Sequence, residues 1–395
     1  MKKTIFLGVL LFALSGCFNS GTVTTDEIKA VKIDQTYHTV IEQNLSTVDT
    51  NKTLEEQIGT MLMVGFTGTE APPSSQICQD IRNYRLGGVI LFDVNPTNKL
   101  LPKNFVDKEQ VTQLTQQLQA CSKDGKLLIA VDQEGGKVQR LKSKYGFYGD
   151  FPKAQQVRCM ADAKVESVYN QMAEELASVG INYNLAPVVD MAVNPKNYII
   201  YQLERSFGSN LDEVVKYSGI FVEAMRQHHI ITALKHFPGH GSSLGDTHKG
   251  FVDVTNLWKK TEIKPYKGLM VEDKVDTVMV AHVFNEKLDD QYPATLSKKT
   301  INGLLRGELD YDGVVITDDL QMGAIANKYG LNNTLKLAIN AGNDILLFGN
   351  QLSTQSMVTT QELVESIKAM VESGEIDQTT IAQSNERIEK LKKRL

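Results

Sequence analysis

The sequence predicts a single (β/α)8 TIM-type barrel with a helical C-terminal extension. From Leu54 onward, short runs rich in Val, Ile and Leu alternate with longer segments whose apolar residues recur at helical spacing. Runs that are apolar on both faces suit parallel strands buried between other layers. The chain of 395 residues contains eight such units, which favours one closed barrel over a doubly wound sheet or two medium-sized domains.

The predicted strands and helices follow one another along the whole body of the chain. The eight strand-like runs are Met61–Phe66, Gly88–Phe92, Leu127–Asp132, Ile181–Pro187, Thr232–His236, Thr277–His282, Gly313–Asp318 and Asp344–Phe348. Helical spacing is clear in the segments Asp107–Ala120, Val165–Val179, Leu211–His228 and Lys298–Gly307. The last segment, Thr360–Leu395, predicts one or two helices that close the ring, so we assign residues 51–395 to the barrel.

The N-terminus has the features of an export signal. A basic start is followed by the short apolar run Thr4–Leu14, which is too short to span a bilayer. The sequence Leu-Ser-Gly-Cys that ends at Cys17 resembles the lipobox of bacterial lipoproteins; the alternative is a plain secretory signal with an incidental cysteine. The resemblance implies a signal peptide at 1–16, lipid modification of Cys17, and a polar tether at 17–50. We therefore expect a lipid-anchored, extracytoplasmic protein, on the periplasmic face of the outer membrane if the cell has one, because Phe18 replaces the aspartate associated with inner-membrane retention.

Charge and cysteine content narrow the function classes. The net charge is −5, from 42 Lys+Arg and 47 Asp+Glu, and no block of basic residues is present, which argues against nucleic-acid binding. A small molecule or a neutral glycan is a better partner. Besides Cys17, the three cysteines Cys78, Cys121 and Cys159 permit at most one internal disulfide and leave a free thiol, and their spacing is not that of a metal site.

Polar side chains recur where the predicted strands end. They are Asp132 after the third run, Asp190 after the fourth, Lys235 and His236 in the fifth, His282 in the sixth and Asp318 in the seventh. The carboxyl ends of barrel strands meet at one mouth, where such barrels carry their chemistry. We therefore expect these side chains to converge on one site.

The segment from Lys235 to His248 predicts a long loop that follows a strand, because it is rich in Gly, Pro and Ser. Asp246 and His248 stand two residues apart, close enough for the carboxylate to orient the imidazole for proton transfer. His236 and His240 could join them as metal ligands, but no His-Glu-x-x-His motif accompanies them. A metal-dependent hydrolase is therefore disfavoured, and we expect neither a metal nor another cofactor.

Two further stretches carry carboxylates. Asp318 ends a buried run and is a candidate nucleophile or electrostatic stabiliser, and we expect its neighbour Asp319 to cap the following helix. The stretch from Asp132 to Arg140 places a carboxylate and a guanidinium beside a Gly-Gly turn, a combination that can grip vicinal hydroxyl groups. It lacks the glycine spacing of a phosphate loop.

These motifs together resemble the β-N-acetylglucosaminidases of glycoside hydrolase family 3, the group that acts on peptidoglycan fragments. The resemblance rests on Asp132–Arg140, on Glu-Arg-Ser-Phe-Gly at 204–208, on the Lys-His-Phe-Pro-Gly-His-Gly loop that ends at Asp-Thr-His, on Pro-Ala-Thr-Leu-Ser at 293–297, and on Thr-Asp-Asp-Leu at 317–320. It runs from Leu54 to Ile388.

The resemblance implies a retaining mechanism and a role for each matching residue. Asp318 matches the nucleophile, and His248, oriented by Asp246, matches the general acid/base. The residues that match sugar-binding positions are Asp132, Arg140, Arg205, Lys235 and His236. We expect Asp190 and His282 to buttress the mouth, and His240 to shape the loop.

The resemblance also implies the substrate. We expect an exo-acting, monomeric enzyme that removes terminal N-acetylglucosamine from peptidoglycan fragments or related glycans. The chain ends after the barrel, which favours the single-domain glucosaminidases over the β-glucosidases with a second domain. A β-glucosidase or other β-glycosidase, and a non-catalytic wall-glycan-binding lipoprotein, remain the alternatives.

Overall fold

A computed structural model describes residues 52–395 of the chain. The predicted signal peptide, the lipidation site Cys17 and the predicted tether lie outside the described residues. In the part that the structure describes, none of the helices is both long and apolar enough to cross a membrane.

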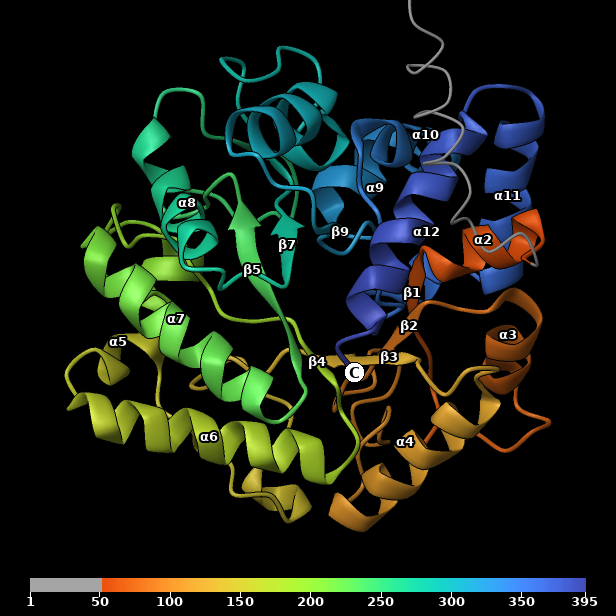
Figure 1. Cartoon of the computed structure of the whole chain (residues 1–395), viewed down its shortest axis with the longest axis horizontal. Helices are drawn as coiled ribbons and strands as arrows, with labels where there is room; N and C mark the ends of the chain where they lie inside the picture. The colour runs from red at the N-terminus through yellow and green to blue at the C-terminus, as the bar shows by residue number, and fades with distance from the viewer. Residues whose placement is uncertain (1–51) are drawn as a thin grey trace, which may run out of the picture. The chain divides into compact units, whose positions relative to one another are not determined.

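Eight parallel strands form the centre of the fold and confirm the predicted barrel (Figure 1). They are β1 (Leu62–Gly65), β2 (Gly88–Ile90), β3 (Leu128–Val131), β4 (Tyr183–Asn184), β5 (Ile231–Phe237), β7 (Thr277–Val280), β9 (Val314–Thr317) and β10 (Leu346–Phe348). Neighbours pair in the order β10-β1-β2-β3-β4-β5-β7-β9, and a parallel bridge between Ile316 and Ile345 closes the ring. Each strand is buried along its length, as the two-sided apolar runs predict.

Helices surround the strands (Figure 1). They are α2 (Leu54–Thr60), α3 (Gln76–Tyr84), α4 (Lys108–Cys121), α5 (Ala154–Val157), α6 (Asp162–Ser178), α7 (Leu211–Gln227), α8 (Lys264–Val271), a π-type helix at Lys299–Glu308, α9 (Gly323–Tyr329), α10 (Leu331–Ala341), α11 (Thr360–Glu372) and α12 (Gln378–Lys392). Side-chain caps explain several starts: Asp107 accepts a hydrogen bond from the N–H of Gln110, and Asn210 accepts from those of Asp212 and Glu213. The four predicted helical segments correspond to α4, α6, α7 and the π-type helix, and their ends agree to within a few residues.

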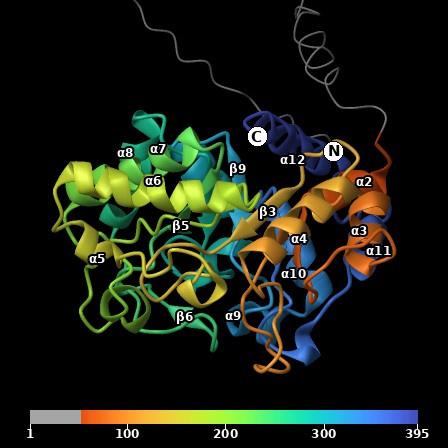
Figure 2. The ribbon, with the colours of Figure 1, turned by 90° about the horizontal axis from the view of Figure 1, so that it is seen from below.

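The C-terminal helix α12 covers the amino ends of the strands. Ser384 in this helix donates to Asp344, which precedes β10, and Arg394, just after the helix, pairs with Asp276, which precedes β7. Figure 2 shows α12 on the side of the barrel opposite to the short strand β6 (Val252–Asp253). Because this helix occupies the amino-terminal side, the mouth formed by the carboxyl ends is left for the site.

Two further features were not fixed by the periodicity. Strand β6 pairs with β8 (Val283–Phe284) in a small parallel sheet that the apolar pattern did not predict. A disulfide joins Cys78 in α3 to Cys121 in α4, and Cys159 is exposed and unpaired among the cysteines that the structure describes. One disulfide and one free thiol is the arrangement that the cysteine count allows.

Candidate functional site

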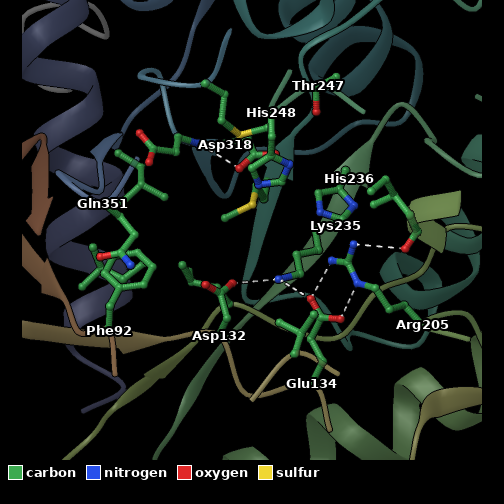
Figure 3. A pocket seen from close by; sticks show the side chains of 18 of the residues that line it. Phe92, Asp132, Glu134, Arg205, Lys235, His236, Thr247, His248, Asp318 and Gln351 are labelled. Atoms are coloured by element: carbon green, nitrogen blue, oxygen red, sulfur yellow. Dashed lines mark hydrogen bonds and ion pairs between the residues drawn. The ribbon is translucent and has the colours of Figure 1, made fainter. Parts of the chain in front are cut away.

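The carboxyl ends of the strands surround a cavity of about 450 Å3 (Figure 3). All the side chains predicted to take part in catalysis or sugar binding line it: Asp132, Arg140, Arg205, Lys235, His236, Asp246, His248 and Asp318. They come from loops and strand ends far apart in the sequence, so the barrel brings them together as the convergence argument predicts.

A network of buried ion pairs forms one wall of the cavity. The Arg205 guanidinium binds both carboxylate oxygens of Glu134 at 2.8 Å, and Lys235 Nζ lies 2.8 Å from Glu134 and 3.0 Å from Asp132. Arg140 reaches the other oxygen of Asp132 at 3.2 Å. Two carboxylates therefore alternate with three cations, and each charge has a partner.

The network sets the ionisation of its members. Burial opposes the charged form of Asp132, but Lys235 and Arg140 outweigh it and lower the pKa of this carboxyl. Burial opposes ionisation of Glu134 too, and Arg205 and Lys235 hold its pKa well below the usual range. Conversely, Glu134 and Asp132 raise the pKa of Lys235 against the effect of burial. All of these groups are charged at neutral pH, and they present both hydrogen-bond donors and acceptors to the cavity.

Glu134 was missed by the sequence reasoning, although it lies inside the Asp132–Arg140 stretch. The signal that could have found it is the pair of glycines that follows. Gly135 and Gly136 have φ of 97° and 57°, and a side chain on Gly135 would meet the carbonyl oxygen of Pro152 at 2.5 Å. The tight turn that they form brings the chain back so that Glu134 and Asp132 both face the cavity.

Asp318 follows β9 and is partly exposed to the cavity. Its Oδ1 accepts the backbone N–H of Asp319 at 2.8 Å. Removal from bulk water disfavours the carboxylate, but the imidazoles of His282, His236 and His248 together lower the pKa of Asp318 to about 2. This carboxylate is thus ionised over the whole physiological range and available as a nucleophile.

His248 lies on the loop that follows β5 and lines the same cavity as Asp318 (Figure 3). Its Nδ1 lies 2.8 Å from Asp246 Oδ1, which also accepts the backbone N–H of His248 at 3.0 Å. The pair predicted from the i, i+2 spacing is therefore present. The tautomer that donates Nδ1–H to Asp246 leaves Nε2 free to exchange a proton. The His248 side chain is 54% exposed, so Nε2 can exchange its proton with solvent or with a molecule in the cavity.

The loop is held at its root by Asp190, which is fully buried. The Asp190 carboxylate accepts the backbone N–H of His240 at 2.7 Å and contacts His236 Nδ1 at 2.7 Å. His240 in turn bonds Ser243, and burial lowers the pKa of its imidazole to about 4. His240 is thus held through its backbone N–H and its Nδ1, an arrangement that agrees with the expected role in shaping the loop.

His282 is fully buried beside the segment that carries Asp318 and Asp319. Its ring nitrogens contact Thr295 Oγ1 at 2.7 Å and the Asp319 carbonyl at 2.9 Å. It therefore supports the segment that carries Asp318, in agreement with a buttressing role.

The prediction that Asp319 caps the following helix is wrong. Helix α9 begins after Met322, and no side chain caps it. Asp319 instead accepts the backbone N–H of Gln321 at 3.0 Å and that of Gly349 at 3.2 Å. The carboxylate turns toward the loop after β10 because that strand is its neighbour in the closed barrel, a contact that the local sequence does not contain.

Two side chains on the other side of the cavity were also not predicted from the sequence. Phe92 from the end of β2 and Gln351 from the loop after β10 line it (Figure 3). Among residues 52–395, no group of three or more His, Cys, Asp or Glu side chains is arranged to hold a metal ion.

Comparison with known protein families matches residues 53–391 to the N-terminal domain of glycosyl hydrolase family 3. The chain is 31% identical to beta-hexosaminidase A of Pseudoalteromonas piscicida over 83% of its own length and 56% of the relative's. It is 33% identical to the beta-hexosaminidase of Tolumonas auensis, over 73% of this chain and 82% of that one.

Solved structures give the same result for the fold. A glycoside hydrolase family 3 beta-N-acetylglucosaminidase from Paenibacillus superposes with a TM-score of 0.77 at 33% identity, covering 87% of this chain and 62% of that chain. A beta-N-acetylhexosaminidase from Beutenbergia cavernae superposes with a TM-score of 0.76 at 27% identity, covering 87% of this chain and all of the other. The chain thus spans little more than half the length of some relatives and nearly the full length of others.

Proposed function

This chain belongs to glycosyl hydrolase family 3, and from that premise we propose that it is an exo-acting, retaining β-N-acetylglucosaminidase. One observation carries the proposal: an ionised Asp318 and an imidazole paired with Asp246 share a cavity whose wall is a network of buried charges. The names of the related beta-hexosaminidases and the fold of the Paenibacillus enzyme support the N-acetylhexosaminide as substrate.

The proposed reaction uses two groups in two steps. Asp318 attacks the anomeric carbon while His248 donates a proton to the departing glycosidic oxygen, so that a covalent glycosyl-aspartate forms. The neutral imidazole then takes a proton from water, which attacks the anomeric carbon and releases the sugar with its configuration retained. Asp246 holds the ring in the orientation that both proton transfers need.

The charged wall is the proposed binding site for the terminal sugar. Asp132, Arg140, Arg205, Lys235 and His236 offer donors and acceptors within one cavity. Since each is already held by a neighbour, little conformational freedom is lost when the sugar binds.

Turnover of paired aryl glycosides tests the proposal. We expect the full chain to release 4-nitrophenol from 4-nitrophenyl N-acetyl-β-glucosaminide, and the Asp318→Asn variant to lose this activity. Faster turnover of the matching glucoside would identify a β-glucosidase instead. A folded protein that binds wall glycans but turns over neither substrate would identify the non-catalytic alternative.

The proposal extends to location and natural substrate. The residues up to Cys17 support a lipoprotein anchored outside the cytoplasm, where its natural substrates would be peptidoglycan fragments or related glycans. Mass spectrometry of the mature N-terminus tests the anchor: a lipid-modified Cys17 is expected, and an unmodified cysteine would contradict it.

A further inference from the structure

Lys103 is a lysine with no exposed surface, next to the site but outside the proposed reaction. It lies in the segment between β2 and α4, where its carbonyl oxygen accepts the N–H of Gly68. Its ammonium group has three N–H donors and three acceptors: the carbonyl oxygens of Gly349 at 3.1 Å and Asn350 at 2.6 Å, and Gln351 Oε1 at 2.8 Å. All three N–H groups thus donate to one turn, the Gly349–Gln351 turn after β10.

Among residues 52–395, no carboxylate lies within hydrogen-bonding distance of this cation. The Phe92 ring lies 4.8 Å from Nζ, and the charge that compensates it at longer range is Asp319. Burial lowers the pKa of Lys103 to about 8, against the opposing effect of Asp319. Burying a charge in this way is costly, and an apolar side chain would fill the same volume without the cost. The position therefore needs the donors of the ammonium group.

A short chain of hydrogen bonds leads from Lys103 to the reacting carboxylate. Gly349 is held on both sides: its carbonyl accepts from Lys103, and its N–H donates to the Asp319 carboxylate at 3.2 Å. The N–H of Asp319 then donates to Asp318 Oδ1 at 2.8 Å. The fit around Gly349 is tight, because a Cβ at this position would lie 2.5 Å from Asp319 Oδ2.

We propose that Lys103 is a positioning residue for Asp318, which it aligns through the Gly349–Gln351 turn and Asp319. Loss of the three donors leaves the carbonyl groups of the turn unpaired and lets the turn move. Asp319 follows the turn, and the amide that orients Asp318 moves with it. A displacement of the nucleophile by about 1 Å is enough to slow the reaction roughly 100-fold.

The test separates positioning from simple stability. We compare Lys103→Met with Lys392→Met, because Lys392 is also buried but lies in α12 at the opposite end of the barrel. Both variants lose a buried cation, and the unfolding temperature of each is measured beside its activity. We expect Lys103→Met alone to lower kcat/KM about 100-fold, with inhibition by free N-acetylglucosamine unchanged within about threefold.

The inference rests on the proposed function, and the two can fail separately. A wild-type chain without turnover overturns both. An active wild type with Lys103→Met equal to Lys392→Met in kcat/KM, or with sugar inhibition weakened as much as turnover, overturns only the role of Lys103. If Lys103→Met does not fold, the Lys103→Gln variant is used in its place, because its amide keeps two N–H donors. A reduced kcat with unchanged inhibition by N-acetylglucosamine supports the positioning role of Lys103. A wild-type kcat overturns it.

Discussion

Replacing Glu134 by glutamine is the sharpest test of the charged wall. Glu134 is 9% exposed and binds Arg205 through two hydrogen bonds and Lys235 through one ion pair. Glutamine has nearly the same shape, but it removes the negative charge and turns an amide N–H₂ toward a cation. Arg205 and Lys235 then have only Asp132 to compensate them inside the wall.

The size of the effect follows from burial. Removing one partner of a buried ion pair costs about 3–5 kcal/mol, because the charge left behind is neither solvated nor paired. With about 340 folded residues and about 2.1 cal/mol/K of unfolding entropy per residue, this loss lowers the unfolding midpoint by about 4–7 °C.

The effect depends on pH with a defined sign. The pKa of Glu134 lies well below its usual value in the folded protein, so its charge stabilises the fold fully above the unfolded pKa near 4.3. That contribution is lost as the pH falls from there toward the folded value. The difference in unfolding free energy between wild type and Glu134→Gln is therefore largest at neutral pH and becomes smaller below about pH 4.5.

Denaturant unfolding of both proteins at pH 7 and at pH 4 measures this difference in unfolding free energy. The control is Glu213→Gln, whose carboxylate is 40% exposed and lies 3.8 Å from Arg158; we expect a change within about 0.5 kcal/mol. A loss below about 1 kcal/mol at pH 7, or a gap that does not narrow at pH 4, would refute the argument that buried charge pairing holds this wall together.

Three further predictions concern the rest of the molecule. Replacing Cys78 and Cys121 by alanine opens a loop of 43 residues, and we expect a loss of up to about 4 kcal/mol in unfolding free energy; an unchanged denaturation curve would show that the bond is not formed. Asp190→Asn removes the charge that holds His236 and the loop root, so kcat/KM should fall roughly 100-fold, and a wild-type rate would exclude a role in loop placement. Prolonged treatment with excess EDTA should leave turnover unchanged, whereas a loss restored by added metal would contradict the metal-free mechanism.

Some features of the site are local in the sequence, and these were predictable. Each strand is apolar on both faces, and this pattern predicts a buried strand, so the eight strands could be located from the sequence alone. The pair of Asp246 and His248 needs only a turn of three residues. Asp318 was identified because a carboxylate at the end of a buried run requires partners or a role.

Other features depend on which elements become neighbours when the ring closes. Glu134 meets its partners across 71 residues of sequence to Arg205, and Lys103 meets Gln351 across 248. Asp319 turned away from its own helix toward Gly349 for the same reason. The pairing of Cys78 with Cys121 likewise required α3 and α4 to pack side by side.

The sequence by itself determined the class of fold and most of the side chains that line the cavity, because burial and short-range spacing are properties of each segment alone. The tertiary structure decided which charge pairs with which, and which lysine donates to the Gly349–Gln351 turn. Those partnerships depend on the strand register and the stagger of the closed barrel, and these are set by all the strands together.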